Sequence, residues 1–137
     1  MNFNQLSNGI ETMMHDKHED KRGYFQELFR VSECEHEVKQ ISRFRINPGE
    51  TRGGHYHTRL IETFIVLEGE CVIHVYDINQ EFPFSQHLAE GEFLTMNTFS
   101  HHTFYSKDGC TLLIAANQEF NQTDTDTFPE LPKKNAR

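Results

Sequence analysis

Two histidines separated by a single residue, His55 and His57, are followed five positions later by Glu62. In a β-strand, side chains two residues apart project from the same face, whereas on a helix the two imidazoles would point about 200° apart. Imidazole nitrogens and a carboxylate together are suitable ligands for zinc, iron, nickel or manganese. The spacing therefore predicts a metal site, or at least a polar catalytic site, on one face of a β-sheet.

The rest of the chain must supply that sheet, and its pattern is that of short strands. Apolar and aromatic runs alternate with turn residues, and no clear amphipathic helix interrupts them. We expect seven or eight strands in an all-β sandwich or barrel. The predicted strand segments are Tyr24–Val31, Val38–Ile46, Ile61–Leu67, Glu70–Asp77, Glu92–Met96, His102–Tyr105 and Cys110–Ala116.

The segments between these runs carry turn and loop signals. Asn47–Gly49 predicts a turn, and Glu68 with Gly69 predicts a hairpin between the two strands that flank them. Residues 78–90, which include Pro83, are expected to form a loop, and the charged residues 11–22 a loop or surface segment. The polar tail after Phe120 is expected to wrap around the domain or to fray.

Length and charge limit the possible functions. The 137 residues fit one domain, 1–137, with residues 1–19 and 129–137 peripheral. A formal net charge of −8 argues against non-specific nucleic-acid binding, which requires a basic surface. The sequence has no bilayer-spanning apolar run and no signal-peptide core, so we expect a soluble cytoplasmic protein without membrane partners. Cys71 and Cys110 lie in apolar runs and are expected to be buried free thiols.

The spacing around the histidines resembles the first motif of the cupin superfamily. That motif is Gly, five residues, His, one, His, four, Glu, six, Gly, and it is filled here by Gly49, His55, His57, Glu62 and Gly69. The resemblance implies a double-stranded β-helix, the cupin jelly-roll barrel.

The second cupin motif is only partly present. Gly91 and His102 fit it, while Asn97, Phe99 and Ser106 stand where the motif has proline, glycine and asparagine. By resemblance, the metal ligands are His55, His57, Glu62 and His102. Because the turn before the third histidine departs from the motif, His101 is the alternative to His102.

A narrower resemblance points to nucleotide-sugar enzymes. Asp20–Glu27 is similar to the D-x-R-G-x-F-x-E segment of dTDP-4-dehydrorhamnose 3,5-epimerases, and Arg52–His57 to a segment of sugar-nucleotide 3,4-ketoisomerases. Residues 115–120 and 125–128 resemble the end of the C-terminal cupin domain in bifunctional capsule-sugar reductase/epimerases. These relatives act on nucleotide-linked 4-keto-6-deoxyhexoses, so the resemblance implies an epimerase or ketoisomerase in surface-polysaccharide sugar biosynthesis.

The implied chemistry is deprotonation at C3 followed by reprotonation of an enolate, with a divalent metal as the Lewis acid. Zinc is the favoured metal, and nickel, iron or manganese are the alternatives. The implied catalytic residues are His55 and His57, the first of which serves as the base in metal-free relatives, and Tyr105 as a candidate acid.

Substrate binding is implied for a further set of residues. In the rhamnose epimerases, the segment that matches Arg22, Phe25 and Glu27 reaches into the partner subunit's nucleotide site, which implies a homodimer. Arg52 matches a residue near the substrate's diphosphate, where a guanidinium can bind phosphate oxygens in pairs. Two other functions are compatible with the motif: a metal-dependent cupin dioxygenase, and a non-catalytic sugar-binding cupin.

Overall fold

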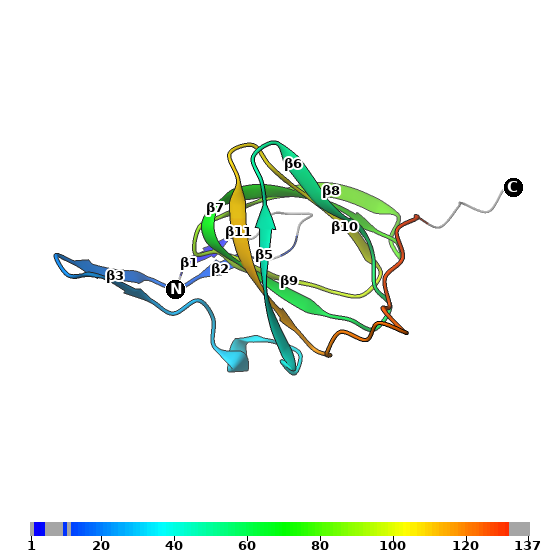
Figure 1. Ribbon diagram of the computed structural model, residues 1–137, viewed down its shortest axis with the longest axis horizontal. Coiled ribbons are helices and arrows are strands. Elements are labelled where there is room, and N and C mark those ends of the chain that lie inside the picture. Colours follow the sequence, from blue (N-terminus) through cyan, green and yellow to red (C-terminus); the bar gives the residue numbers. More distant parts are fainter. Residues whose placement is uncertain (1, 5–9, 11, 132–137) are drawn as a thin grey trace, which may run out of the picture.

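The computed structural model describes residues 2–4, 10 and 12–131, which form an almost entirely β-stranded fold (Figure 1). The one helical element is a 3-10 turn, η1, at Val31–Glu33, within the residues that the structure describes. The strands are β1 (Asn2–Asn4), β2 (Thr12–Met14), β3 (Lys17–Asp20), β4 (Gly23–Gln26), β5 (Gln40–Ile46), β6 (Glu50–His55), β7 (Glu62–Asp77), β8 (Phe82–Ala89), β9 (Phe93–Met96), β10 (Ser100–Ser106) and β11 (Cys110–Ala116).

Two antiparallel layers share the long strand β7 and enclose a barrel (Figure 1). The first half of β7 pairs with β9 and β11, and the layer continues through β5 on one side and through β2 and β1 on the other. The second half of β7 pairs with β8 and β10, and β10 pairs in turn with β6. This is the jelly-roll barrel that the sequence predicts.

The hairpin predicted at Glu68 and Gly69 is wrong, because the chain bends there without reversing its direction. Residues 62–77 form one continuous strand, and Gly69 adopts a φ of +82° at the point where the strand passes from one layer to the other. A side chain at this position would meet the backbone of Gly109 on the neighbouring turn. Glycine therefore allows the strand to bend at a corner of the barrel. A local sequence pattern does not distinguish such a bend from a hairpin turn.

The predicted loop at 78–90 is also wrong over most of its length. Phe82–Ala89 forms β8, which pairs only with β7 among the described strands and is therefore an edge strand. An edge strand tolerates Pro83, because the missing N–H need not join a ladder. The segment 11–22 likewise contains β2 and β3, although β3 lies on the surface as expected.

The strand predicted at Tyr24–Val31 is confirmed only in its first part, because β4 ends at Gln26 and Val31 begins η1. The other predicted strands are confirmed in type. In β5, exposed Arg43 and Arg45 alternate with Phe44 and Ile46, which face the interior. β11 spans the predicted Cys110–Ala116, and β9 and β10 lie within or close to their predicted ranges. Asn47–Gly49 forms the turn between β5 and β6. Cys71 and Cys110 are buried free thiols.

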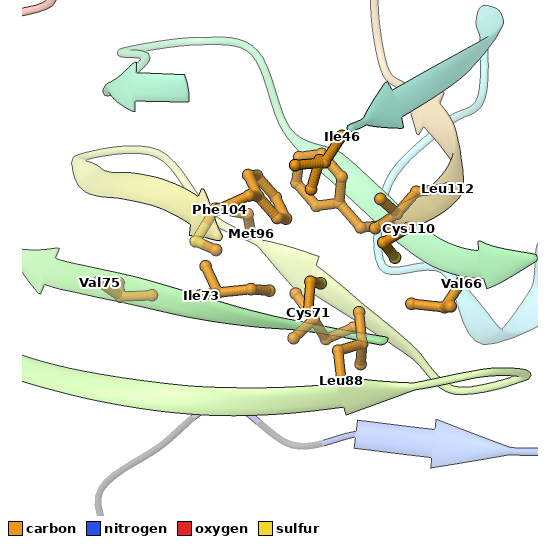
Figure 2. Packing of buried hydrophobic residues seen from close by; sticks show 12 residues of the cluster. Ile46, Val66, Cys71, Ile73, Val75, Leu88, Met96, Phe104, Cys110 and Leu112 are labelled. Atoms are coloured by element: carbon orange, nitrogen blue, oxygen red, sulfur yellow. The ribbon is translucent and has the colours of Figure 1, made fainter. Parts of the chain in front are cut away.

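The inward side chains of both layers form one apolar core (Figure 2). The buried residues shown there include Ile46, Val66, Cys71, Ile73, Val75, Leu88, Met96, Phe104, Cys110 and Leu112. The strands that line this core, β5 and β7 to β11, contribute it from one face, as a sheet with one face in the core requires. Among the described residues, no helix has the length and apolar character needed to cross a membrane.

Two segments lie outside the barrel wall. The β3–β4 hairpin projects from one side, and the segment that follows β11 runs along the opposite side (Figure 1, blue and orange to red). The second segment returns to the barrel at Phe128, which forms an isolated antiparallel bridge with Tyr56. Its backbone N–H donates to the carbonyl of Tyr56, and the N–H of Tyr56 donates back, both at 3.0 Å.

Candidate metal centre

Neighbouring strands bring the predicted histidines together. In the β6–β10 ladder, His55 pairs directly with His102. This close approach depends on Gly53, whose φ is +92° and whose missing Cβ would lie 2.8 Å from the carbonyl oxygen of His102. His57 lies just beyond the end of β6, and Glu62 is the first residue of β7.

The three imidazoles form a compact cluster in the barrel. The ligand atoms of His55, His57 and His102 all lie within 4.8 Å of one another. His57 and His102 are buried, whereas His55 is half-buried. The rings of Phe64 and Phe104 contact His102, with centroids 6.0 and 5.9 Å away, so the apolar core forms one wall of the cluster.

Backbone carbonyls orient two of the three rings. Nδ1 of His57 lies 2.8 Å from the carbonyl oxygen of Asp126, and Nδ1 of His102 lies 2.8 Å from that of Ser100. Because a carbonyl can only accept, each Nδ1 carries the proton and donates it. Each Nε2 is then free to present its lone pair, as in metal sites where a second interaction fixes the histidine tautomer.

Glu62 adds a carboxylate next to these nitrogens. Its Oε1 atom lies 3.1 Å from Nε2 of His57 and 3.9 Å from Nε2 of His102. Nε2 of His57 is nevertheless a buried atom that makes no well-aligned hydrogen bond, and it is the one such side-chain atom among the described residues. A lone pair facing a carboxylate is unfavourable unless a proton or a metal cation lies between them. The donor set therefore fits a divalent metal held by His55, His57, His102 and Glu62.

The environment gives the three histidines different proton affinities. Burial, together with the charge of His57, holds the pKa of His55 below its ordinary value. Burial also lowers the pKa of His102, to about 4. For His57, burial is outweighed by neighbouring Glu62 and by the Asp126 carbonyl, so the pKa lies above its ordinary value. Two of the three rings are therefore neutral at pH 7 and able to act as ligands.

A cavity of about 210 Å³ opens above the cluster. It is smaller than the roughly 300–1,000 Å³ of a pocket for a drug-sized ligand, so it suits a single ring. The polar residues among the described lining carry imidazole, carboxylate, amide and hydroxyl groups, and none is lysine or arginine, while Leu60, Ile114, Ala116 and Phe120 form the apolar part of the lining. Besides His55, His57 and Glu62, these polar lining residues are Gln40, Ser42, Gln118, Glu119, Asn121, Thr125 and Thr127.

The structure brings one of the two adjacent histidines to the cluster. His102 is in the cluster, whereas His101 is on the outer face of β10, where its Nε2 lies 3.3 Å from the carbonyl of Pro129. Tyr105 is also on that outer face, because His102, Phe104 and Ser106 alternate inward. The structure does not bring Tyr105, the predicted acid, to the cluster, because strand alternation turns its side chain to the outer face.

The predicted substrate-binding residues lie apart from the cluster. Arg52 is exposed, with its guanidinium 4.9 Å from the ring centre of Phe44. Arg22 and Phe25 belong to the projecting β3–β4 hairpin, where Arg22 pairs with Asp20. Glu27 follows the hairpin and pairs with Arg30 at 2.8 Å.

Two features of the centre were not predicted from the sequence. Asp126 caps the turn after His57, and Phe128 stacks on Tyr56 with ring centres 5.3 Å apart. Both come from the segment after β11, more than sixty residues beyond the histidine pair. Short polar side chains such as those of Thr58 and Asp126 are common in turns, but this tendency does not indicate which two turns contact each other.

The fold and the centre define a cupin-type barrel with a candidate metal site of three clustered histidines, to which Glu62 lies adjacent. Comparison with known proteins places it more narrowly. Residues 18–128 match the family described as the polysaccharide biosynthesis C-terminal domain, and the chain belongs to that family.

One curated relative and two solved structures show which proteins the chain is similar to. The chain is 30% identical over 116 residues to a UDP-2-acetamido-2,6-beta-L-arabino-hexul-4-ose reductase of Pseudomonas aeruginosa, which covers 81% of this chain but 30% of that protein. The chain thus spans less than a third of the curated relative's length.

The solved structures share the fold at lower identity. A 3,4-ketoisomerase from Helicobacter canadensis superposes with a TM-score of 0.73 at 23% identity, covering 87% of this chain and 89% of that one. A dTDP-4-dehydrorhamnose 3,5-epimerase from Sulfolobus tokodaii superposes with a TM-score of 0.74 at 18% identity, covering 90% and 78%.

Proposed function

We propose that this protein is an isomerase that deprotonates C3 of a nucleotide-linked 4-keto-6-deoxy sugar, in the synthesis of sugars for a surface polysaccharide. The observation that carries the proposal is the cluster of His55, His57, His102 and Glu62 at the base of a cavity of about 210 Å³. The names of the similar proteins support the substrate class, since they include a ketoisomerase, an epimerase and a reductase of a UDP-linked hexul-4-ose.

The cavity suits the sugar ring rather than the nucleotide. Its polar lining groups can hydrogen-bond to sugar hydroxyls, and the absence of lysine and arginine among the described lining residues disfavours a diphosphate there. The diphosphate would remain outside, where exposed Arg52 is available. A divalent metal held by the three histidines and Glu62, with zinc favoured, would stabilise the negative charge on the enolate oxygen when bound.

A group that lines the cavity must accept the C3 proton. The candidates among the described lining residues are His55, His57, Glu62 and Glu119. The first three are required as metal ligands, so we assign the proton transfer to Glu119, whose exposed side chain lies in the segment after β11. A carboxylate can serve as base once the adjacent ketone is polarised.

The test is hydrogen exchange in deuterated water. The zinc-loaded protein is incubated with dTDP- or UDP-4-keto-6-deoxyglucose, and incorporation of deuterium at C3 is followed by NMR. We expect exchange well above the rate in buffer alone, and about 100-fold or greater slowing in Glu119→Gln without loss of zinc. If deuterium is incorporated with neither the dTDP-linked nor the UDP-linked sugar, the proposed function is refuted.

A matched substitution separates the role of Glu119 from a general charge effect. Glu68 is also exposed, lies at the bend of β7 and does not line the cavity. Glu68→Gln should keep the wild-type exchange rate. If both variants slow exchange equally, Glu119 is not the base.

The proposal includes a homodimer. The β3–β4 hairpin projects away from the barrel and leaves Tyr24 and Phe25 each 65% exposed (Figure 1). Exposed aromatic rings on a projecting element favour burial against a partner. Light scattering should give twice the chain mass, and the double substitution Tyr24→Ser with Phe25→Ser should shift the protein towards monomer.

A further inference from the structure

The carboxylate of Asp126 lies at the junction between the segment after β11 and the candidate metal centre. It is 3% exposed, and both of its oxygens accept hydrogen bonds. Oδ1 accepts from the backbone N–H of Thr58 at 3.0 Å and from its hydroxyl at 2.6 Å. Oδ2 accepts from the backbone N–H groups of Arg59 at 2.6 Å and Leu60 at 2.9 Å.

These donors belong to the turn that joins two of the proposed ligands. Thr58, Arg59 and Leu60 lie between His57 and Glu62, so the conformation of the turn sets how those two side chains meet. The same residue contacts His57 directly, because the backbone carbonyl of Asp126 accepts the Nδ1 proton of that ring at 2.8 Å. Asp126 thereby fixes both the turn and the tautomer of the histidine.

The backbone of Asp126 is held in an uncommon conformation. Its φ is +50°, in the left-handed region that residues other than glycine, asparagine and aspartate seldom adopt. This conformation lets one residue direct its side chain to the turn and its carbonyl to His57. Uncommon backbone angles persist where surrounding contacts determine them, and they concentrate at functional sites.

We infer that Asp126 is a positioning residue that sets the orientation of His57 and its distance from Glu62 for metal binding. The inference rests on the proposed metal centre, although its tests do not require turnover of a sugar. Removing a hydrogen bond that orients a metal ligand typically changes metal affinity or activity by 10- to 100-fold.

Asparagine at this position is a conservative but unfavourable replacement. It tolerates a positive φ and retains one oxygen for Thr58. Its amide, however, would direct N–H groups at the N–H groups of Arg59 and Leu60. Asp126→Asn therefore removes the hold on the turn while it preserves the size of the side chain.

The test measures the ligand and the metal separately, and it uses a matched control. Zinc affinity is measured by calorimetry, and the ring nitrogens of His57 are observed in long-range proton–nitrogen NMR spectra of the chelator-treated protein. In Asp126→Asn, at a pH above the pKa of His57, we expect zinc affinity to fall by about 10- to 100-fold and the single Nδ1-protonated form of His57 to become a mixture of tautomers. Asp124→Asn is the control, because the carboxylate of Asp124 is exposed and pairs only with the side chain of Arg59 in the described contacts.

Each outcome bears on the inference. Folded Asp126→Asn with wild-type zinc affinity and an unchanged His57 spectrum would overturn it, and so would equal losses in Asp124→Asn. If Asp126→Asn does not fold, Thr58→Val decides, since it removes only the hydroxyl donor and should weaken zinc binding by a smaller factor. If no sugar exchanges deuterium but zinc affinity responds to Asp126, the proposed function fails and the positioning role stands. If the wild-type protein binds no zinc, the inference is overturned, whatever the His57 spectrum shows.

Discussion

The backbone N–H of Phe99 donates a 2.7 Å hydrogen bond to the carbonyl of His57, and Phe99 makes this bond with a φ of +60°. The second cupin motif has glycine at this position, so an aromatic residue here adopts a conformation that glycine adopts without strain. Stacking on Tyr56, with ring centres 6.4 Å apart, accompanies this conformation. Phe99, Tyr56 and Phe128 thus form a row of rings beside the centre.

The first prediction separates the ring of Phe99 from its backbone. Phe99→Ala loses the aromatic contact but keeps the left-handed backbone, and should lower the free energy of unfolding by about 1–3 kcal/mol. Phe99→Gly loses the same contact but relieves the strain, so it should be about 1 kcal/mol more stable than the alanine variant. Urea unfolding of chelator-treated protein measures both; a more stable alanine variant would contradict the assignment of strain.

The second prediction concerns metal binding by the adjacent histidines. Zinc at 100 times its dissociation constant should stabilise the wild-type protein by about 2.7 kcal/mol, seen as a rise in melting temperature. His102→Asn should abolish most of this rise, because His102 is in the cluster. His101→Asn should retain it, because that ring lies on the outer face. Comparison of the rise with and without zinc cancels any general effect of each substitution on folding.

The third prediction is a pH dependence of stability. Burial depresses the pKa of His102 from 6.5 to about 4, so between these values the unfolded chain binds a proton that the native state does not. The contribution is fully present above pH 6.5 and is lost as pH falls to about 4, by about 3 kcal/mol. His57, whose pKa is raised, contributes with the opposite sign, so the informative quantity is the difference between wild-type protein and His102→Asn.

Chemical denaturation of chelator-treated samples from pH 7 to pH 4 provides this measurement. The stability of the wild-type protein should fall more steeply than that of His102→Asn. Parallel curves would show that His102 is not protonated differently in the two states.

Asp126 changes its protonation state at lower pH than His102. Burial raises its pKa, but hydrogen bonds from Thr58, Leu60 and Arg59 outweigh that effect and lower the pKa to about 2, so its contribution is lost below about pH 3.8.

The fourth prediction tests the close approach of β6 and β10. In Gly53→Ala, the new Cβ would lie 2.8 Å from the carbonyl of His102, in addition to the strain of a φ of +92°. We expect a loss of more than about 2 kcal/mol and weaker zinc binding. Gly49→Ala is the matched control, since its φ is +78° and no atom lies within 4 Å of the new Cβ. It should show the strain cost alone, about 1 kcal/mol, with unchanged zinc affinity.

The histidine cluster could be predicted from the sequence because its geometry follows from strand period and a spaced motif. His55 and His102 occupy paired positions on adjacent strands, as the motif implies. The same period-two rule places Tyr105 on the face opposite His102, since the two are three positions apart, so this placement could also have been predicted from the sequence.

Other features depend on contacts that no local pattern contains. β7 bends at Gly69 because its first half pairs with one set of strands and its second half with another. Only the complete barrel determines this division. Asp126 reaches the turn after His57 across 68 residues, and neither turn predicts the other. Long-range polar pairing of this kind has no periodicity to read, in contrast to the apolar alternation of β5 or β11.

The hydrogen bond from His57 to Asp126 also orders events during synthesis of the chain. His57 leaves the ribosome 69 residues ahead of Asp126, which at roughly 5–20 residues per second is an interval of several seconds. Throughout that interval the nascent barrel has the histidine but not the carbonyl and carboxylate that orient it. Loading of the proposed metal centre is therefore expected as a late step of biogenesis, after the last strand has been translated, and metal added to a translation reaction should be retained only by chains released beyond residue 126.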